Sequence, residues 1–271
     1  MAKETEDLDP RLRPAAFTGK KKVRARDQRS IPKPDAMAKF FESPVFVGCR
    51  SEDELDEPGP LVFHRAAYFG PMLAHYQGMR REEFCGLAVN DIVLDNGEHP
   101  YIHVRFNELR RLKNNQSVRN LALHPELVGL GFLAYLDCLR NLGISRVFPD
   151  LYNPLTKAAL GDRLYKELQP IRERLGITPH QFRHFFNNEL KQNRVSQEFR
   201  EDLMGHKGQS ETTERYCDPV EISLQLEDLA KIQLRTRHLQ PQPIRLIFWV
   251  EKKQPPSWSR SHKRRGTFQG D

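Results

Sequence analysis

Histidine, arginine and tyrosine side chains recur between residues 180 and 216 at spacings that suit phosphoryl-transfer chemistry. His180 and Arg183 are three residues apart and share one face of the first turn of an expected helix. The backbone amides of such a turn are unpaired and slightly positive, which favours a bound anion. His206 follows a glycine that is expected to end a helix, and Tyr216 comes ten residues later. Together these residues can hold a phosphate and attack it.

A tyrosine hydroxyl that displaces a phosphodiester needs partners of defined chemistry. Guanidinium groups neutralise the non-bridging oxygens in the transition state, and a base and an acid move protons at the bridging oxygens. Arg80 is the candidate second arginine, and Arg81 beside it is interpreted as a solvated helix residue. Lys113 is the candidate acid, because its neighbours Arg110 and Arg111 hold their protons too tightly for that role.

The same residues also have plainer interpretations. His180 and His184 are four residues apart like a metal-binding pair, but the glutamate of the HExxH motif and an evident third ligand are missing. His184 is interpreted as a packed or phosphate-supporting residue. Tyr216 by itself is compatible with a half-buried aromatic residue of a helix, and only the histidines and arginines around it make it a candidate nucleophile.

Composition indicates a soluble, cytoplasmic protein, associated with the nucleoid if it is bacterial. The 271 residues contain no apolar run of the length that spans a membrane, and residues 1–10 do not have the pattern of a secretory signal. The cysteines Cys49, Cys85, Cys138 and Cys217 are scattered without CxxC pairing, which predicts reduced, structural thiols.

Charge is distributed unevenly along the chain. The net charge of +7 consists of +4 in residues 1–35, +7 in residues 235–271 and −4 in residues 36–234. Basic ends are typical of nucleic-acid binding, and solvated tails have the same composition. If the middle of the chain binds DNA, it does so through a local patch of positive charge.

Hydrophobic periodicity predicts a mainly α protein with a small antiparallel β-sheet, an α+β class. The expected helical stretches are 59–78 (interrupted at Gly70-Pro71), 80–92, 126–143, 156–176 and 222–234, and the expected strands are 101–106 and 118–124.

Two helices in the second half have clear sequence caps. Thr178 is an expected N-cap, followed by Pro179 at the first helical position and Gln181 at the capping-box position. Ser196 is an expected N-cap of a helix that Gly205 ends.

Further along, Ser210 can cap a helix over 211–218 that Pro219 stops. Residues 244–250, with the sequence IRLIFWV, are compatible with a strand or a buried anchor.

The ordered set of motifs resembles the catalytic domain of tyrosine recombinases, the phage-integrase family, over roughly residues 40–234. The motifs are GMRREEFCGLAVNDI, a hairpin lysine, HQFRH, a Gly-His pair and a terminal tyrosine. The matching positions are Gly78, Met79, Arg80, Glu83, Lys113, His180, Arg183, His206 and Tyr216. Their order and the intervals of 23 residues from Arg183 to His206 and 10 from His206 to Tyr216 make the resemblance specific.

The resemblance implies a breaking-rejoining fold and a site-specific recombinase. Arg80 and Arg183, aided by His206, would clamp the scissile phosphate. Tyr216 would attack the phosphate and form a 3′-phosphotyrosyl link.

Lys113 would protonate the leaving 5′-oxygen, and His180 would act as the base. No metal or nucleotide cofactor is implied, because the phosphotyrosine stores the bond energy. The implied partner is double-stranded DNA, with a homo-tetramer at synapsis, accessory DNA-bending proteins and no membrane.

The expected organisation has three parts. Residues 1–35 form a basic arm in place of the family's usual helical core-binding domain, which is expected to be absent or truncated; residues 36–234 form the catalytic domain, and 235–271 a basic tail. Two alternatives remain. The chain can be a non-catalytic DNA-binding remnant of a recombinase, or less favourably a type IB topoisomerase, which relaxes DNA without a defined site.

Overall fold

The protein is mainly α-helical with one three-stranded antiparallel sheet, as the sequence predicts. The computed structural model describes residues 31–94, 99–110, 112, 117–153, 159–205 and 218–254. The first half contains α1 (Pro34–Phe41), α2 (Pro44–Val47), α3 (Ala66–Tyr76), α4 (Arg81–Cys85), η2 (Val89–Asp91), β1 (Ile92–Val93), β2 (Tyr101–Val104) and β3 (Arg119–Ala122). The second half contains α5 (Pro125–Gly129), α6 (Phe132–Asn141), η4 (Pro149–Leu151), α7 (Leu160–Glu167), α8 (Gln169–Leu175), α9 (Pro179–Gln192), α10 (Gln197–Met204), α12 (Ile222–Leu229) and α13 (Phe248–Glu251).

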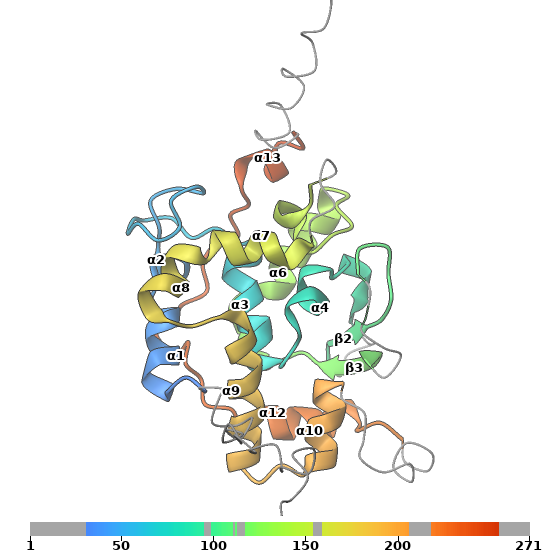
Figure 1. Ribbon diagram of the computed structural model, residues 1–271. Helices are drawn as coiled ribbons and strands as arrows, with labels where there is room; N and C mark the ends of the chain where they lie inside the picture. The colour runs from blue at the N-terminus through green and yellow to red at the C-terminus, as the bar shows by residue number, and fades with distance from the viewer. Residues whose placement is uncertain are drawn as a thin grey trace, which may run out of the picture. The chain divides into compact units, whose positions relative to one another are not determined.

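Helix α3 is the centre of the core. All eleven of its residues are buried, and it packs against α9, α4 and α7, as Figure 1 shows. A helix that is apolar on every side is stable only where other elements surround it. The two helices that carry the candidate arginines therefore share α3 as their support.

The expected interruption of this helix at Gly70-Pro71 was wrong. Helix α3 continues through Pro71, although proline removes a backbone donor. A Cβ at Gly70 would lie 2.9 Å from Phe84 and 3.2 Å from Leu164, so the glycine lets α4 and α7 pack closely on α3. Burial on all sides outweighs the local helix-breaking tendency of the pair.

The sheet has the order β1-β2-β3, with Ile92 opposite Ile102 and Tyr101 opposite Ala122. Strands β2 and β3 confirm the two expected strands. On the outer edge of β3, Gln225 of α12 accepts a hydrogen bond from the Ala122 amide at 2.9 Å and donates to the Asn120 carbonyl at 3.1 Å. A glutamine side chain thus completes the edge strand and ties α12 to the sheet.

Several long expected helices are divided in the structure. The 126–143 stretch becomes α5 and α6 because Gly131 adopts a left-handed conformation with φ of 88°. The 156–176 stretch is described from Ala159 on and divides into α7 and α8, with Pro170 in the first turn of α8. The 80–92 stretch becomes the short helices α4 and η2.

Residues 218–254 contain a segment that packs back against the first half of the chain. The Arg245 carbonyl accepts the His64 amide at 2.8 Å, and Leu246 and Ile247 are buried. The IRLIFWV segment is therefore an anchor that is buried at Leu246, Ile247 and Val250, not a strand, and its last three residues lie in α13. None of the described helices is long and apolar enough to cross a membrane.

Candidate DNA-phosphate site

A tight turn after α3 places Arg80. Gly78 has φ of 60°, a conformation that glycine adopts without strain, and a Cβ there would lie 2.4 Å from the Phe186 ring. Arg80 is then the N-cap of α4, and its backbone amide donates to Glu83 Oε2 at 2.9 Å. The motif that the sequence presents as Gly-Met-Arg therefore fixes both the backbone and the direction of Arg80.

Helix α9 places Arg183 one turn from its beginning. Gln181 Oε1 accepts the Thr178 amide at 2.7 Å, which confirms the expected cap. The Arg183 side chain is buried and donates through Nη1 to the Gly78 carbonyl and through Nη2 to the Met204 carbonyl at 2.5 Å. The turn that orients Arg80 is thus also bonded to Arg183.

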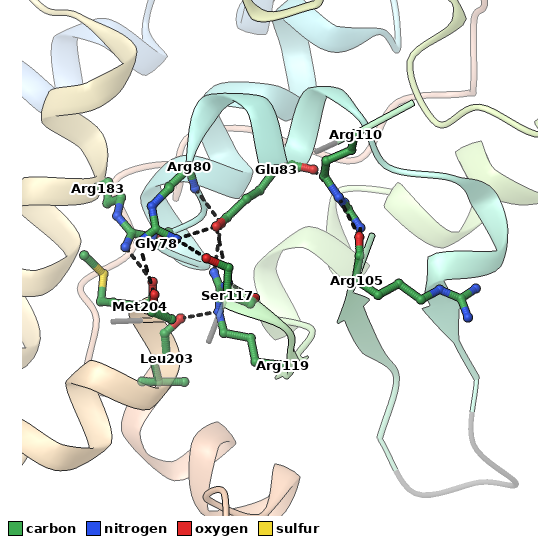
Figure 2. Close-up of polar contacts among 11 residues, drawn as sticks. Gly78, Arg80, Glu83, Arg105, Arg110, Ser117, Arg119, Arg183, Leu203 and Met204 are labelled. Atoms are coloured by element: carbon green, nitrogen blue, oxygen red, sulfur yellow. Dashed lines mark hydrogen bonds and ion pairs between the residues drawn. The ribbon is translucent and has the colours of Figure 1, made fainter. Parts of the chain in front are cut away.

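Three arginines bind three consecutive carbonyls at the end of α10, as Figure 2 shows for Arg183 with Met204 and Arg119 with Leu203. Arg119 Nε donates to Leu203 O at 2.9 Å, and Arg80 Nη2 donates to Gly205 O at 3.1 Å. The last carbonyls of a helix lack partners within it, and cations interact favourably with that end. This arrangement joins α4, α9 and β3 to one point of the chain.

Glu83 is the carboxylate that the arginines share. It is 3% exposed; its Oε1 lies 2.6 Å from Arg80 Nη1 and its Oε2 lies 2.9 Å from Arg119 Nη2. Burial raises the pKa of this carboxyl, but the charges and hydrogen bonds of Arg119 and Arg80 outweigh burial and hold the pKa at about 2. Glu83 is therefore ionised at neutral pH.

The cluster keeps an excess of positive charge. Burial lowers the pKa of Arg183, and the neighbouring charges of Arg80 and Arg119 lower it further, while Glu83 acts in the opposite direction. Three guanidinium groups thus face one carboxylate. An anion bound here would relieve the repulsion among the arginines, which is what a phosphate-binding site requires.

His180 and Arg80 line the same cleft of about 560 Å³, together with Leu112, Tyr165 and Thr178. His180 is exposed, and its ring lies 4.4 Å from the ring of His184 in an edge-to-face arrangement. The structure therefore brings together three of the predicted site residues: Arg80, Arg183 and His180.

The other three predicted residues, Lys113, His206 and Tyr216, lie outside the described residues. The same holds for the helix expected after Ser210. Arg81 also lines the cleft, but its guanidinium is paired with Asp162 of α7 at 3.0 Å and not with Glu83. Of the two adjacent arginines, Arg80 is the one that contacts Glu83 and the end of α10, and its role in phosphate binding stays a prediction.

Sequence reasoning missed Arg119 and the role of Arg110. In the sequence Arg119 appears only as part of the expected strand 118–124, although a basic residue two positions before the apolar Leu121, on the same face of that strand, is the signal that could have drawn attention to it. Arg110 is 3% exposed and donates to the carbonyls of Glu83 and Arg105 (Figure 2), so it ties the hairpin to α4.

Comparison with known proteins places the chain in a family. The model of the phage integrase family matches residues 56–221, more than half of the chain. The chain therefore belongs to the phage integrase family, the tyrosine recombinases, and family membership implies a protein that acts on DNA.

Among solved structures, the integrase from mycobacterium phage Brujita is similar with a TM-score of 0.48 and 14% sequence identity. The match covers 84% of this chain and 65% of the integrase, so the chain spans less than two thirds of that protein. A search of curated proteins found no match.

Proposed function

We propose that this protein is a site-specific DNA recombinase that cleaves and rejoins strands through a 3′-phosphotyrosyl intermediate. The observation that carries the proposal is the convergence of Arg80 and Arg183 on one point beside a cleft that contains His180. Two guanidinium groups fixed by backbone carbonyls are preorganised, so they need little rearrangement when charge develops on a phosphate.

In the cleavage step, the Tyr216 oxygen attacks the scissile phosphorus and the bond to the 5′-oxygen breaks. His180 takes the tyrosine proton, and Lys113 gives a proton to the leaving 5′-oxygen. Arg80 and Arg183 neutralise the non-bridging oxygens, with His206 as a further donor.

Rejoining is the reverse reaction with a different strand. The 5′-hydroxyl of a second strand attacks the phosphotyrosyl phosphorus and releases the tyrosine. Because a phosphodiester is broken and remade, the exchange needs no external energy source. Synapsis of two sites implies a homo-tetramer in which each protomer cuts one strand, with DNA-bending proteins as accessory partners.

The test uses the full chain and its Tyr216→Phe variant, without added metal, on nicked duplexes tiled across the DNA that flanks its own gene. We expect a protease-sensitive shifted band on a denaturing gel that the variant does not form. DNA binding without any such band would favour the non-catalytic remnant. Relaxation of supercoiled DNA without a defined site would favour a topoisomerase.

A further inference from the structure

The side chain of Arg119 is directed inward, toward α4 and α10. It is 6% exposed, and its donors contact Leu203 O at 2.9 Å, Ser117 O at 2.8 Å and Glu83 Oε2 at 2.9 Å. Arg80, by comparison, is 25% exposed and lines the cleft. Arg119 is thus bonded to Glu83 and to the end of α10, the two parts that hold Arg80 and Arg183, and unlike Arg80 it does not line the cleft that contains His180.

We propose that Arg119 is a positioning residue for strand cleavage. It acts through Glu83 on Arg80, and through Leu203 on the end of α10, from which the chain continues to His206 and Tyr216. The inference rests on the proposed function, and it adds a residue that the sequence motifs do not contain.

The first path runs through the shared carboxylate. Glu83 binds Arg80 on one oxygen and Arg119 on the other, so both sides of the carboxylate are fixed (Figure 2). Without Arg119, burial is opposed by one arginine fewer, and the pKa of Glu83 rises. A carboxyl group that takes up a proton loses its charge-assisted bond to Arg80, whose guanidinium then becomes free to move.

The second path runs through the end of α10. Gly205 ends the helix with φ of 58°, and a Cβ there would lie 2.7 Å from Arg119 Nη1, so the guanidinium packs directly against the turn. In the same turn, the Met204 carbonyl accepts a hydrogen bond from Arg183 and the Gly205 carbonyl accepts one from Arg80. Arg119 therefore keeps this turn in register with the two arginines that are proposed to bind the phosphate.

If Arg119 only stabilised the fold, replacing another buried, ion-paired arginine would be expected to slow strand cleavage to the same extent. Arg65 provides that control: it is 7% exposed, lies 2.9 Å from Glu167 and 3.5 Å from Asp150, and stands directly before the opposite end of α3. Arg65 does not contact Glu83 or the end of α10 in the described contacts.

The experiment compares the full chain with Arg119→Gln, Arg119→Lys and Arg65→Gln. Single-turnover formation of the covalent adduct on the nicked duplexes is measured between pH 5 and 8, and duplex affinity is measured by fluorescence anisotropy. Carbon-13 NMR of labelled glutamate follows the titration of Glu83, assigned with Glu83→Gln.

For Arg119→Gln we expect adduct formation to slow by about 10²-fold, the cost of misplacing a reacting group by about 1 Å. We expect DNA affinity to stay within about threefold, because the phosphate contacts that set affinity are spread over many residues and Arg119 does not line the cleft of Arg80 and His180. As the pH is lowered, adduct formation by Arg119→Gln should be lost at a higher pH than adduct formation by the parent chain. The midpoint pH of the Glu83 titration should also rise. Arg119→Lys should recover part of the rate by keeping the charge.

Arg65→Gln should leave the rate, the pH profile and the Glu83 midpoint unchanged even if it lowers stability. If both glutamine variants slow the reaction equally, Arg119 is only structural and the inference is wrong. If the parent chain forms no adduct, the proposed function fails, and the NMR titration decides the inference: an unchanged Glu83 midpoint in Arg119→Gln overturns it.

Discussion

Substitution of Glu83 by glutamine tests the electrostatic basis of the arginine cluster. Glutamine keeps the size of the side chain but removes the charge that offsets Arg80 and Arg119. The side chain of Glu83 is 4% exposed, so its interactions are weakly screened by solvent. Removing one partner of a buried ion pair leaves uncompensated charge and costs about 3–5 kcal/mol.

The pKa gives an independent magnitude for the same interaction. A shift from the ordinary value of 4.5 to about 2 corresponds to about 3 kcal/mol of folding free energy at neutral pH. Since the folded-state pKa is depressed, this stability is complete above pH 4.5 and is lost as pH falls toward 2. We therefore expect the difference between the parent chain and Glu83→Gln to shrink over that interval.

The assay is urea unfolding of the parent chain, Glu83→Gln and Glu82→Gln between pH 7 and pH 3. Glu82 is the adjacent residue, its side chain is 43% exposed, and its partner Arg81 is 32% exposed, so its loss should change stability by less than about 1 kcal/mol. Equal effects of the two substitutions at pH 7, or a Glu83→Gln effect that does not depend on pH, would refute the reasoning.

Three further predictions test the local structure. Gly78→Ala should destabilise the fold by about 2–4 kcal/mol in urea unfolding because it adds a clash with Phe186 to the strain of a positive φ, whereas Gly143→Ala, with φ of 69° and open space, should cost only about 1–2 kcal/mol. Equal costs would contradict the packing argument. Ser196→Ala should lower the melting temperature through loss of a cap that is worth about 1 kcal/mol, and no change would contradict the cap seen at 3.2 Å. Burial lowers the pKa of His75 to about 3, so the unfolded chain takes up the proton first and stability falls as pH drops below 6.5; His75→Leu should weaken that dependence between pH 6.5 and 3, and an unchanged slope would exclude His75 as a source.

Local signals allowed much of the fold to be predicted. The caps at Thr178 and Ser196 are set by residues within three positions of each other, so sequence is sufficient to find them. The strands β2 and β3 follow from a period of two. The continuity of α3 through Pro71 could not be predicted in this way, because it depends on α4 and α7 packing against Gly70 from distant parts of the chain.

The same distinction between local signals and long-range contacts applies to the candidate site. Arg80 and Arg183 were identified from motif order, but their common attachment to the end of α10 was not, since it joins residues 125 and 21 positions apart. Arg119 was missed because its contacts with Glu83 and Leu203 exist only in the folded chain. Propensity and motif spacing contain no information on such long-range hydrogen bonds.

Mass spectrometry of the trapped DNA adduct tests the central claim most directly. After nuclease and protease digestion, we expect a nucleotide joined through its 3′-phosphate to the peptide that contains Tyr216, and no such peptide from Arg183→Gln or Tyr216→Phe. A nucleotide on another residue, or a 5′-phosphate link to Tyr216, would contradict the account.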